Sequence, residues 1–474
     1  MRADIKEVSE LPEGWKSLSV DSLGKAITGN TPPTKDSANY GGDIPFIKPT
    51  ELIDRPVSIG RETISKKGAE KARILPKGGV LVSCIGNLGK TAIAIREVAF
   101  NQQINAIVFN ETVIPEYGFY YFQTVKFRKD LELLASATTI SIVNKSKFES
   151  IYLPIAPIEQ QKQIVAKIEQ LFSHIDAGIE ALNTAKQRLK QYRQSVLKAA
   201  VTGELTKEWR EENKSKLEPA SQLLERILLT HRQKWEEQQL EQFEAKGKIP
   251  KNDKWKEKYK EAPSPRKSDL PIIPANWKWV TLQQVFDVIT DGDHQAPPKS
   301  DNGVPFLVIG NVNKGVLEFG GTRFVPREYF DNLSEIRTPR KGNILYTVVG
   351  SYGIPVKVDS DKEFCVQRHI AILKASKEMS LDYLYHILSS GFVFKQATDV
   401  ATGTAQKTVP LGGLREICIP LPPISEQLDI SQTIDIKLSA MSRLNNEIDI
   451  QLKKSKTNKQ SILASAFSGK LCNG

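Results

Sequence analysis

The sequence is poor in the residues that most often build metal, redox or disulfide sites. Its 474 residues include only four cysteines and five histidines, and both kinds are scattered. Cys84, Cys365, Cys418 and Cys472 lie too far apart to give a metal-ligand spacing, so no metal site is expected in this chain. So few cysteines fit a reducing compartment, and we expect a cytoplasmic protein.

Long apolar runs are also missing. No stretch approaches the ~20 apolar residues of a membrane-spanning helix, and the first ten residues, MRADIKEVSE, contain no apolar signal core. With 40% hydrophobic and 26% charged residues, the composition is that of an ordinary globular protein. We therefore expect no membrane partner.

Motifs for catalysis are absent as well. The sequence contains no G-x-G-x-x-G, H-E-x-x-H or G-x-S-x-G, and no [DNS]-P-P-[YF] of the kind that amino-methyltransferases use. The stretch CIGNLGKT (84–91) resembles a phosphate-binding loop, but Cys84 stands where the first glycine is needed. The following AIAIREV is typical of a strand and not of the required helix. We therefore expect no chemistry and no cofactor in this chain.

What the chain does have is positive charge. Its formal net charge is +11, and its isoelectric point is about 9.2. A basic balance of this size favours a polyanionic partner, most simply nucleic acid.

The chain also has an internal repeat. Three pairs of segments match: SVLKAAVTGEL (195–205) with SILASAFSGKL (461–471), LPIAPIEQQKQI (153–164) with IPLPPISEQLDI (419–430), and PEGWKSLSVDSL (12–23) with PANWKWVTLQQV (274–285). The first two pairs are 266 residues apart and the third 262. The stretches between these joints diverge. Matching joints with divergent interiors indicate one scaffold that carries two different domains.

A long helix is expected after each proline-rich joint. Apolar residues keep 3/4 spacing from Ile158 to Val201 and again after Ile424, and Gly203 and Gly469 are suited to end these helices. The pattern is that of a coiled coil with polar interruptions such as Lys186. Each helix could pack on its own domain instead, but their equal length favours pairing with each other.

The resulting fold class is α+β with a pseudo-twofold internal repeat. Short apolar runs broken by turns predict mixed α/β domains, separated by two long helices in an antiparallel coiled coil. The expected organisation is a first domain at 1–153, a first helix at 154–205, a helical and charged linker at 206–273, a second domain at 274–419 and a second helix at 420–474.

Polar loops at matching places in the two halves supply candidate DNA contacts. Gln and Asn can pair with adenine, and Lys and Arg with guanine, through two hydrogen bonds each. In the first half the candidates are Thr31, Thr34, Lys35, Asn39, Tyr40, Lys48, Asn87, Lys90, Gln102 and Gln103. In the second half they are His294, Gln295, Lys299, Asn311, Ser351, Tyr352, Gln367, Arg368, His369, Gln406 and Lys407.

The chain resembles the specificity subunit of type I restriction-modification systems. The resemblance rests on the two divergent domains, the repeated helix ends, and the segments LPIAPIEQQKQI, LPPISEQLDI and VTGELTKEWREEN. The resemblance covers essentially the whole chain. It implies a non-catalytic, DNA-binding subunit in which each domain reads one half of a bipartite, asymmetric double-stranded target. The helices would space these domains.

The resemblance also implies partners. Two copies of a DNA adenine methyltransferase subunit would dock on the helices, and restriction subunits would join the full complex. S-adenosylmethionine, ATP and magnesium would belong to those subunits. The repeated helix ends are the expected docking surface, with Leu197, Ala200, Leu205, Leu463, Ala466 and Leu471 as candidate contacts.

Two alternatives stay open at this point. The same architecture could serve a stand-alone DNA-binding or scaffold protein outside a restriction system. An enzyme with an unrecognised site would require turnover by the isolated chain.

Overall fold

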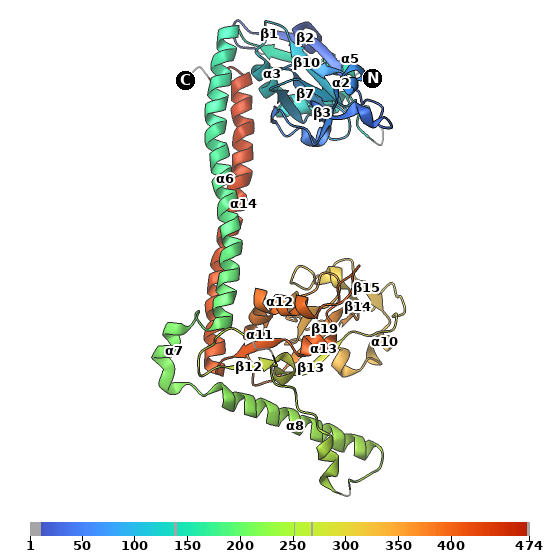
Figure 1. The fold of residues 1–474 in the computed structure, drawn as a ribbon, viewed down its shortest axis with the longest axis vertical. Coiled ribbons are helices and arrows are strands. Elements are labelled where there is room, and N and C mark those ends of the chain that lie inside the picture. Colours follow the sequence, from blue (N-terminus) through green and yellow to red (C-terminus); the bar gives the residue numbers. More distant parts are fainter. Residues whose placement is uncertain (1–10, 137–139, 251, 267–268, 472–474) are drawn as a thin grey trace. The chain divides into compact units, whose positions relative to one another are not determined.

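The structure is a computed structural model that describes residues 11–136, 140–250, 252–266 and 269–471. The chain divides into two compact units, one formed by the residues up to Ala185 together with those from Glu447 onward, the other by Lys186–Asn446. Each unit therefore holds one domain and a part of both long helices, α6 (Ile158–Thr202) and α14 (Ile424–Phe467) (Figure 1). No helix of the described residues is long and apolar enough to cross a membrane.

The first domain is built on a five-stranded sheet in the order β2-β10-β7-β8-β4, a second sheet in the order β5-β3-β9-β6 and the pair β1-β11. The strands are β1 (Lys16–Ser19), β2 (Gly24–Thr28), β3 (Tyr40–Ile47), β4 (Arg55–Val57), β5 (Glu62–Ile64), β6 (Ile74–Leu75), β7 (Val80–Ser83), β8 (Thr91–Ala94), β9 (Val98–Phe100), β10 (Ile104–Phe109) and β11 (Tyr152–Ile155). The short helices are α1 (Val20–Leu23), α2 (Lys66–Lys71), α3 (Pro115–Tyr121), α4 (Val125–Leu134) and α5 (Lys145–Glu149). The strand β8 confirms that no helix follows the glycines of the CIGNLGKT stretch.

The second domain repeats this plan with a four-stranded sheet in the order β13-β19-β16-β17, a sheet β15-β14-β18 and the pair β12-β20. The strands are β12 (Lys278–Thr281), β13 (Phe286–Asp291), β14 (Val304–Leu307), β15 (Arg323–Val325), β16 (Ile344–Thr347), β17 (Pro355–Lys357), β18 (Cys365–Val366), β19 (Ile370–Ala375) and β20 (Cys418–Leu421). The helices are α9 (Leu282–Val285), α10 (Arg327–Asp331), α11 (Leu381–Leu388), α12 (Gly391–Val400) and α13 (Leu411–Arg415). The predicted α+β repeat is thus confirmed.

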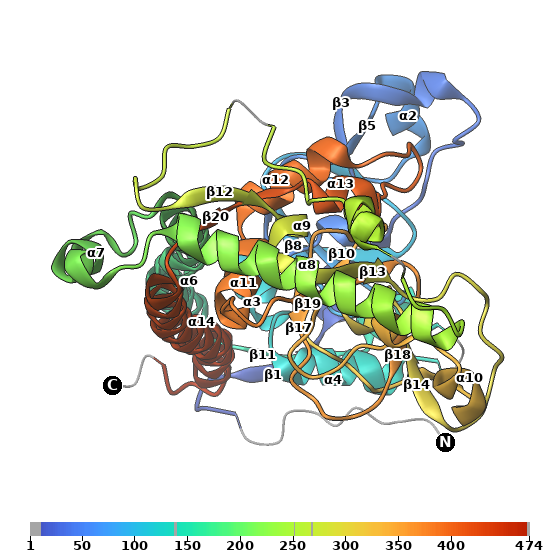
Figure 2. The ribbon, with the colours of Figure 1, turned by 90° about the horizontal axis from the view of Figure 1, so that it is seen from below.

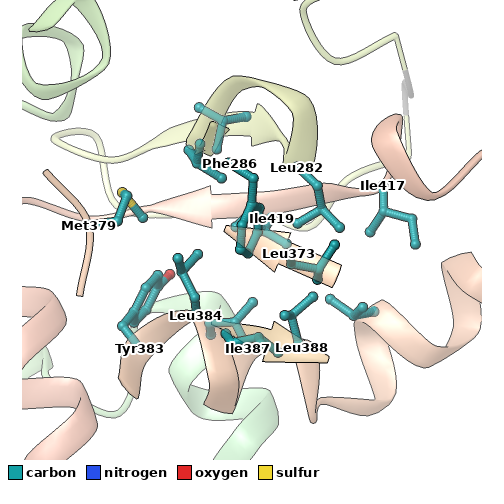
Figure 3. Packing of buried hydrophobic residues seen from close by; sticks show 14 of the residues in the cluster. Leu282, Phe286, Leu373, Met379, Tyr383, Leu384, Ile387, Leu388, Ile417 and Ile419 are labelled. Carbon is teal, nitrogen blue, oxygen red and sulfur yellow. The ribbon is translucent and has the colours of Figure 1, made fainter. Parts of the chain in front are cut away.

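The core of the second domain lies between its main sheet and the helices α11 and α12. Tyr383, Ile387 and Leu388 point from α11 toward the sheet, where they form one cluster with Leu373 of β19 and Ile419 of β20 (Figure 3). All five side chains are buried, so the apolar stripe of α11 is covered by the sheet.

The joints between domain and long helix share two sets of side-chain hydrogen bonds. The hydroxyl groups of Tyr117 and Tyr383 each donate to the carbonyl of a joint proline, over 2.8 and 2.7 Å. The side chains of Gln161 and Gln427 each accept a backbone N–H of their domain and donate to the carbonyl five residues earlier. These buried amides fix the first turn of α6 and of α14, because an unpaired buried amide would be costly.

The C-terminal end of each long helix is buried in the core of a domain other than the one that precedes the helix in the chain. Leu463 and Phe467, near the end of α14, pack in the first unit, where the ring of Phe467 lies 5.0 Å from that of Tyr117. Leu197 and Val201, near the end of α6, pack in the second unit. Each helix thus begins in one unit and ends in the other, which makes their pairing antiparallel, as predicted.

This burial corrects the predicted docking contacts. Leu197, Ala200, Leu463 and Ala466 are at most 1% exposed, so their side chains are not available to a partner. Leu205 and Leu471 pack, partly buried, against the same cores. The helix ends repeat because they complete two similar cores.

Gly203 and Gly469 end the two helices, as predicted. Both have positive φ angles, +77° and +75°, that L side chains rarely adopt. A Cβ atom at Gly203 would lie 2.5 Å from Pro274, and one at Gly469 would lie 2.4 Å from Pro12. Each helix stop is therefore packed against the proline that precedes a domain.

The region predicted as a linker, 206–273, is largely structured. It forms α7 (Lys207–Asn213), α8 (Ala220–Ala245) and short 3₁₀ turns at Lys214–Lys216 and Asp253–Lys258. Leu223 and Ile227 of α8 are fully buried against the second domain, and Lys234 binds Asp287 over 2.5 Å. The helix α8 is therefore an integral part of the second unit (Figure 2).

Candidate nucleic-acid interface

Most of the candidate residues gather at one end of each main sheet. In the first domain β2 and β7 end there and β10 and β8 begin there, because neighbouring strands are antiparallel. The strands β13, β16, β19 and β17 meet in the same way in the second domain. We term these ends the first loop edge (29–35, 84–90 and 101–103) and the second loop edge (292–299, 348–354 and 367–369). Each loop was predicted from the sequence, and the strand order of the sheet brings the loops of one domain together.

At the first loop edge two loops are joined by a side-chain hydrogen bond. The hydroxyl of Thr31 donates to Oε1 of Gln102 over 2.7 Å. Thr34, Lys35 and Asn87 are exposed beside them, whereas Lys90 and Gln103 are half-buried. The exposed amides and the cation are of the kind that reads base edges or contacts phosphates.

Three first-half candidates have structural roles. Asn39 is fully buried, and its amide donates to the carbonyl of Pro33 over 2.9 Å, which excludes it as a base contact. The hydroxyl of Tyr40 donates to the carbonyl of Pro32 over 2.7 Å, and burial raises the pKa of Tyr40. Both anchor the loop that carries Thr34 and Lys35. Lys48 is paired with Glu62 over 2.5 Å.

At the second loop edge the candidates line a cavity of about 430 Å³. Its lining includes His294, Gln295, Lys299, Gln367 and Arg368 from the candidate set. Gln295, Lys299 and Arg368 are exposed at its rim. Such a concave, cationic surface suits a phosphate or a guanine edge.

Carboxylates hold this loop in place. Asp291 accepts from Nε2 of His294 over 2.8 Å, and Asp293 accepts from the hydroxyl of Tyr329 over 2.8 Å. Burial would raise the pKa of Asp293, but its hydrogen bonds outweigh this effect and lower it. These hydrogen bonds tie Asp291 and Asp293 to their own domain, while Lys299 and Arg368 stay exposed.

In each domain a backbone segment from later in the chain lies beside the turn between the central strands. Gly86 donates to the carbonyl of Ser141, and Gly350 donates to that of Lys407, each over 2.9 Å. Ser351 of the second turn and Gln406 and Lys407 of the segment beside it are exposed. His369 is half-buried, and burial, followed by the charge of Arg368, lowers its pKa, which keeps the ring neutral near pH 7.

Asn311 is a second-half candidate that the structure removes from the set of base contacts. It is 9% exposed, accepts from the N–H of Val308 and donates to the carbonyl of Glu318. Its oxygen closes the 3₁₀ turn Ile309–Asn311 and its nitrogen ties that turn to Glu318. This role was not predictable from the sequence, since Asn is common both in such turns and at base contacts.

Sequence reasoning also missed residues that come from distant segments. Arg323 of β15 lines the cavity of the second loop edge. Asp54 and Arg128 flank the turn 86–90, as shown below. No local motif marks these positions, because only the tertiary fold brings them to a loop edge.

Comparison with known proteins bears on both domains. The family described as "Type I restriction modification DNA specificity domain" matches residues 12–187 and 274–454. The chain belongs to this family. The two matched segments each cover one domain and most of one long helix, which agrees with the repeat seen in the sequence and in the fold.

Members of the specificity family with similar sequences span almost the whole chain. The type I restriction enzyme EcoBI specificity subunit of Escherichia coli is 22% identical, covering 99% of this chain and 88% of that protein. The EcoKI specificity subunit of E. coli K12 is 20% identical, covering 98% and 90%. Among solved structures, the HsdS subunit from Thermoanaerobacter tengcongensis has a TM-score of 0.52 at 18% identity, covering 98% of this chain and 99% of that one.

A second solved structure is more similar in fold. A chain from a study of complex assembly and conformational transition of the type I R-M system has a TM-score of 0.67 at 18% identity. It covers 97% of this chain and 99% of that one. At these identities the likeness establishes the specificity-subunit fold and not the identity of any DNA contact.

Proposed function

We propose that this protein is the DNA sequence-specificity subunit of a type I restriction-modification complex. The observation that carries the proposal is the pair of loop edges, which sit on one repeated scaffold but carry different side chains. A protein that recognises two different DNA half-sites requires two similar backbone supports that carry different polar side chains. The basic net charge of +11 adds a general attraction for the DNA backbone.

The chain itself supplies recognition and assembly, and its partners supply chemistry. Among the described residues no cluster of His, Cys, Asp and Glu could hold a metal ion. We propose that two methyltransferase subunits bind this chain and methylate adenine with S-adenosylmethionine. Restriction subunits that use ATP and magnesium would join them. Because the helix ends are buried, docking would use the exposed surface of α6 and α14.

The test is to assemble the full-length chain with its methyltransferase subunits and map methylated adenines on a DNA library. We expect one bipartite, asymmetric motif. Arg368→Ala, at the second loop edge, should lower methylation of that motif about tenfold, within the range of about 1–3 kcal/mol for a base contact. Lys377→Ala, on an exposed turn beyond the other end of β19, is the matched control and should have little effect.

Gln102→Ala and Lys25→Ala form the equivalent pair for the first domain, since Lys25 lies at the opposite end of β2. Stable sequence-specific binding by the isolated chain, with no assembly with methyltransferase subunits, would support a stand-alone DNA-binding protein instead. Equal losses for loop-edge and control variants would overturn the assignment of the loop edges.

A further inference from the structure

The turns that join the central strands have the same backbone frame in both domains. We term residues 86–90 the first inner turn and residues 350–354 the second. Each turn is bounded by two glycines with positive φ angles: Gly86 and Gly89 at +75° and +75°, Gly350 and Gly353 at +68° and +86°. In each, the second glycine donates to the carbonyl of the last strand residue, Ser83 or Thr347, over 2.9 Å. The hydroxyl of that residue accepts a backbone N–H from the end of the turn.

What packs against this shared frame differs between the domains. In the first, Arg128 of α4 lies against the turn, where a Cβ atom at Gly89 would be 2.9 Å from its Cγ. Its guanidinium binds Oδ2 of Asp54 over 2.7 Å. Oδ1 of Asp54 accepts from the N–H and the hydroxyl of Thr91 over 3.0 and 2.9 Å. Asp54 has a φ of +59°, a rare conformation for a residue other than glycine.

In the second domain an aromatic stack occupies the same place. Phe394 of α12 matches Arg128 at the repeat offset of 266 residues. A Cβ atom at Gly353 would lie 2.6 Å from its ring. That ring is stacked on Tyr352 of the inner turn, with ring centres 5.6 Å apart and planes 7° from parallel. The hydroxyl of Tyr352 bonds to Thr398 of α12 over 3.1 Å.

We infer that the pairs Arg128–Asp54 and Phe394–Tyr352 are positioning residues that set the accuracy with which each domain reads its half-site. This inference rests on the proposed function. The exposed tips, Asn87 and Ser351, can select a base only if their turns are held to a fraction of an ångström. Since the backbone frames are alike, the side chains behind them decide how firmly each tip is held. One tip is held by an ion pair and the other by stacked rings.

The two kinds of support predict different responses to salt. The carboxylate and guanidinium of the Asp54–Arg128 pair are 34% and 38% exposed, so dissolved ions screen their attraction. The stacked rings of Phe394, which is 47% exposed, and Tyr352 carry no charge, so dissolved ions do not screen the contact between them. Raised ionic strength should therefore increase misreading of one half-site more than of the other, beyond the overall loss of DNA binding.

The experiment uses the assembled methyltransferase complex and a DNA library in which each base of both half-sites is varied. Arg128→Met and Asp54→Asn each break the ion pair, and asparagine still tolerates the positive φ at position 54. Both should raise methylation of sites with an incorrect base in one half by about fivefold, the upper end for a part-exposed ion pair. Phe394→Leu should do so in the other half only. Arg128→Lys keeps the ion pair and Phe394→Tyr keeps the stack, and both should retain selectivity.

Thermal unfolding midpoints of all variants show whether a change reflects loss of folding. A merely structural role would lower methylation of every site together, without changing base preference in one half. That result, or relaxation of both halves by the same variant, would overturn the inference. If Arg128→Met does not assemble, Arg128→Lys and the salt series of the unmodified complex carry the test. A complex with no bipartite motif at all would instead contradict the proposed function.

Discussion

Glu426 at the start of α14 is a fully buried carboxylate with every oxygen in use. Oε1 accepts from Nε of Arg210 and from the hydroxyl of Thr206, and Oε2 accepts from Nε1 of Trp277, each over 2.8 Å. The first unit has Gln160 in this place, which accepts from Nε1 of Trp15 over 3.0 Å. The same joint is thus held by a buried charge in one unit and by a neutral amide in the other.

Removing that charge should be costly. Glu426→Ala leaves the Arg210 guanidinium, which is 11% exposed, without its partner, and should lower the free energy of unfolding of the second unit by about 3–5 kcal/mol. Gln160→Ala is the matched control and should cost about 1 kcal/mol, the worth of a neutral hydrogen bond. Denaturant unfolding followed by tryptophan fluorescence gives both values. Equal losses would contradict the role assigned to the buried pair.

His386 should make the second unit sensitive to acid. It is 3% exposed, and burial lowers its pKa below the usual value of about 6.5, with the nearby carboxylates of Asp435 and Asp382 opposing this shift and Lys357 adding to it. A lowered pKa means that the unfolded chain binds a proton more readily than the folded one. Its contribution to stability is therefore complete above about pH 6.5 and is lost as the pH falls below that value.

The measurement is the unfolding midpoint of the second unit between about pH 7.5 and about pH 5, a range that includes the ordinary histidine pKa. His386→Asn should flatten the fall that the unmodified protein shows in this range. His174→Asn, at an exposed position of α6, is the control and should leave it unchanged. An identical acid response in both variants would show that other groups are responsible.

Which polar residues face solvent was only partly predictable. Gln295, Lys299 and Arg368 are exposed at a loop edge as expected. The side-chain amides of Asn39 and Asn311 instead donate hydrogen bonds to backbone carbonyls. Sequence identifies the residue type, but a base contact and a turn anchor use the same amide. The decision depends on neighbours that arrive from distant parts of the chain.

The long helices were the most predictable elements. The sequence placed the first at Ile158–Val201, and α6 ends one residue later, because 3/4 apolar spacing and a terminal glycine are local signals. What covers the apolar ends was not predictable. Periodicity shows that a face is buried but not against which surface. Leu197 and Leu463 were predicted to contact a partner and instead complete a core.

The end of α14 should therefore control the stability of the first unit. Leu463→Ala removes a fully buried side chain, and we expect a loss of about 2–5 kcal/mol there. Ile450→Ala, on the same helix but 41% exposed, should cost little. Amide hydrogen exchange read separately for β7 and β16 would locate the loss in the first unit. Equal weakening of both strands would contradict this placement.

An exchange of whole domains should alter recognition one half at a time. Replacing the second domain by that of a related specificity subunit should change only one half of the methylated motif, because the interiors diverge while the joints match. The structure adds that the exchanged segment must include α8, since Arg226 of α8 binds Glu378 over 3.2 Å and Lys234 binds Asp287. Exchange of residues 274–419 alone should give a less stable protein. Altered recognition in both halves would contradict independent reading.

The length of the paired helices should set the spacing of the half-sites. Four residues inserted after Ala185 of α6 add about 6 Å and about one turn, so the mapped half-sites should move apart by roughly one or two base pairs. Two inserted residues rotate the following face by about 200°, which should disrupt the apolar seam and abolish methylation. Unchanged spacing with intact methylation in the four-residue variant would contradict this role.

The burial of Leu463 and Phe467 in the first core also has a consequence for synthesis. The strands of the first domain leave the ribosome early, but the side chains that finish its core follow roughly 300 residues later, a delay of about 15–60 s at typical translation rates. Until then Tyr117 and Tyr121 lack the ring that covers them. The nascent first domain should therefore be a client for chaperones, and truncated translation products should be removed by proteases while complete chains persist.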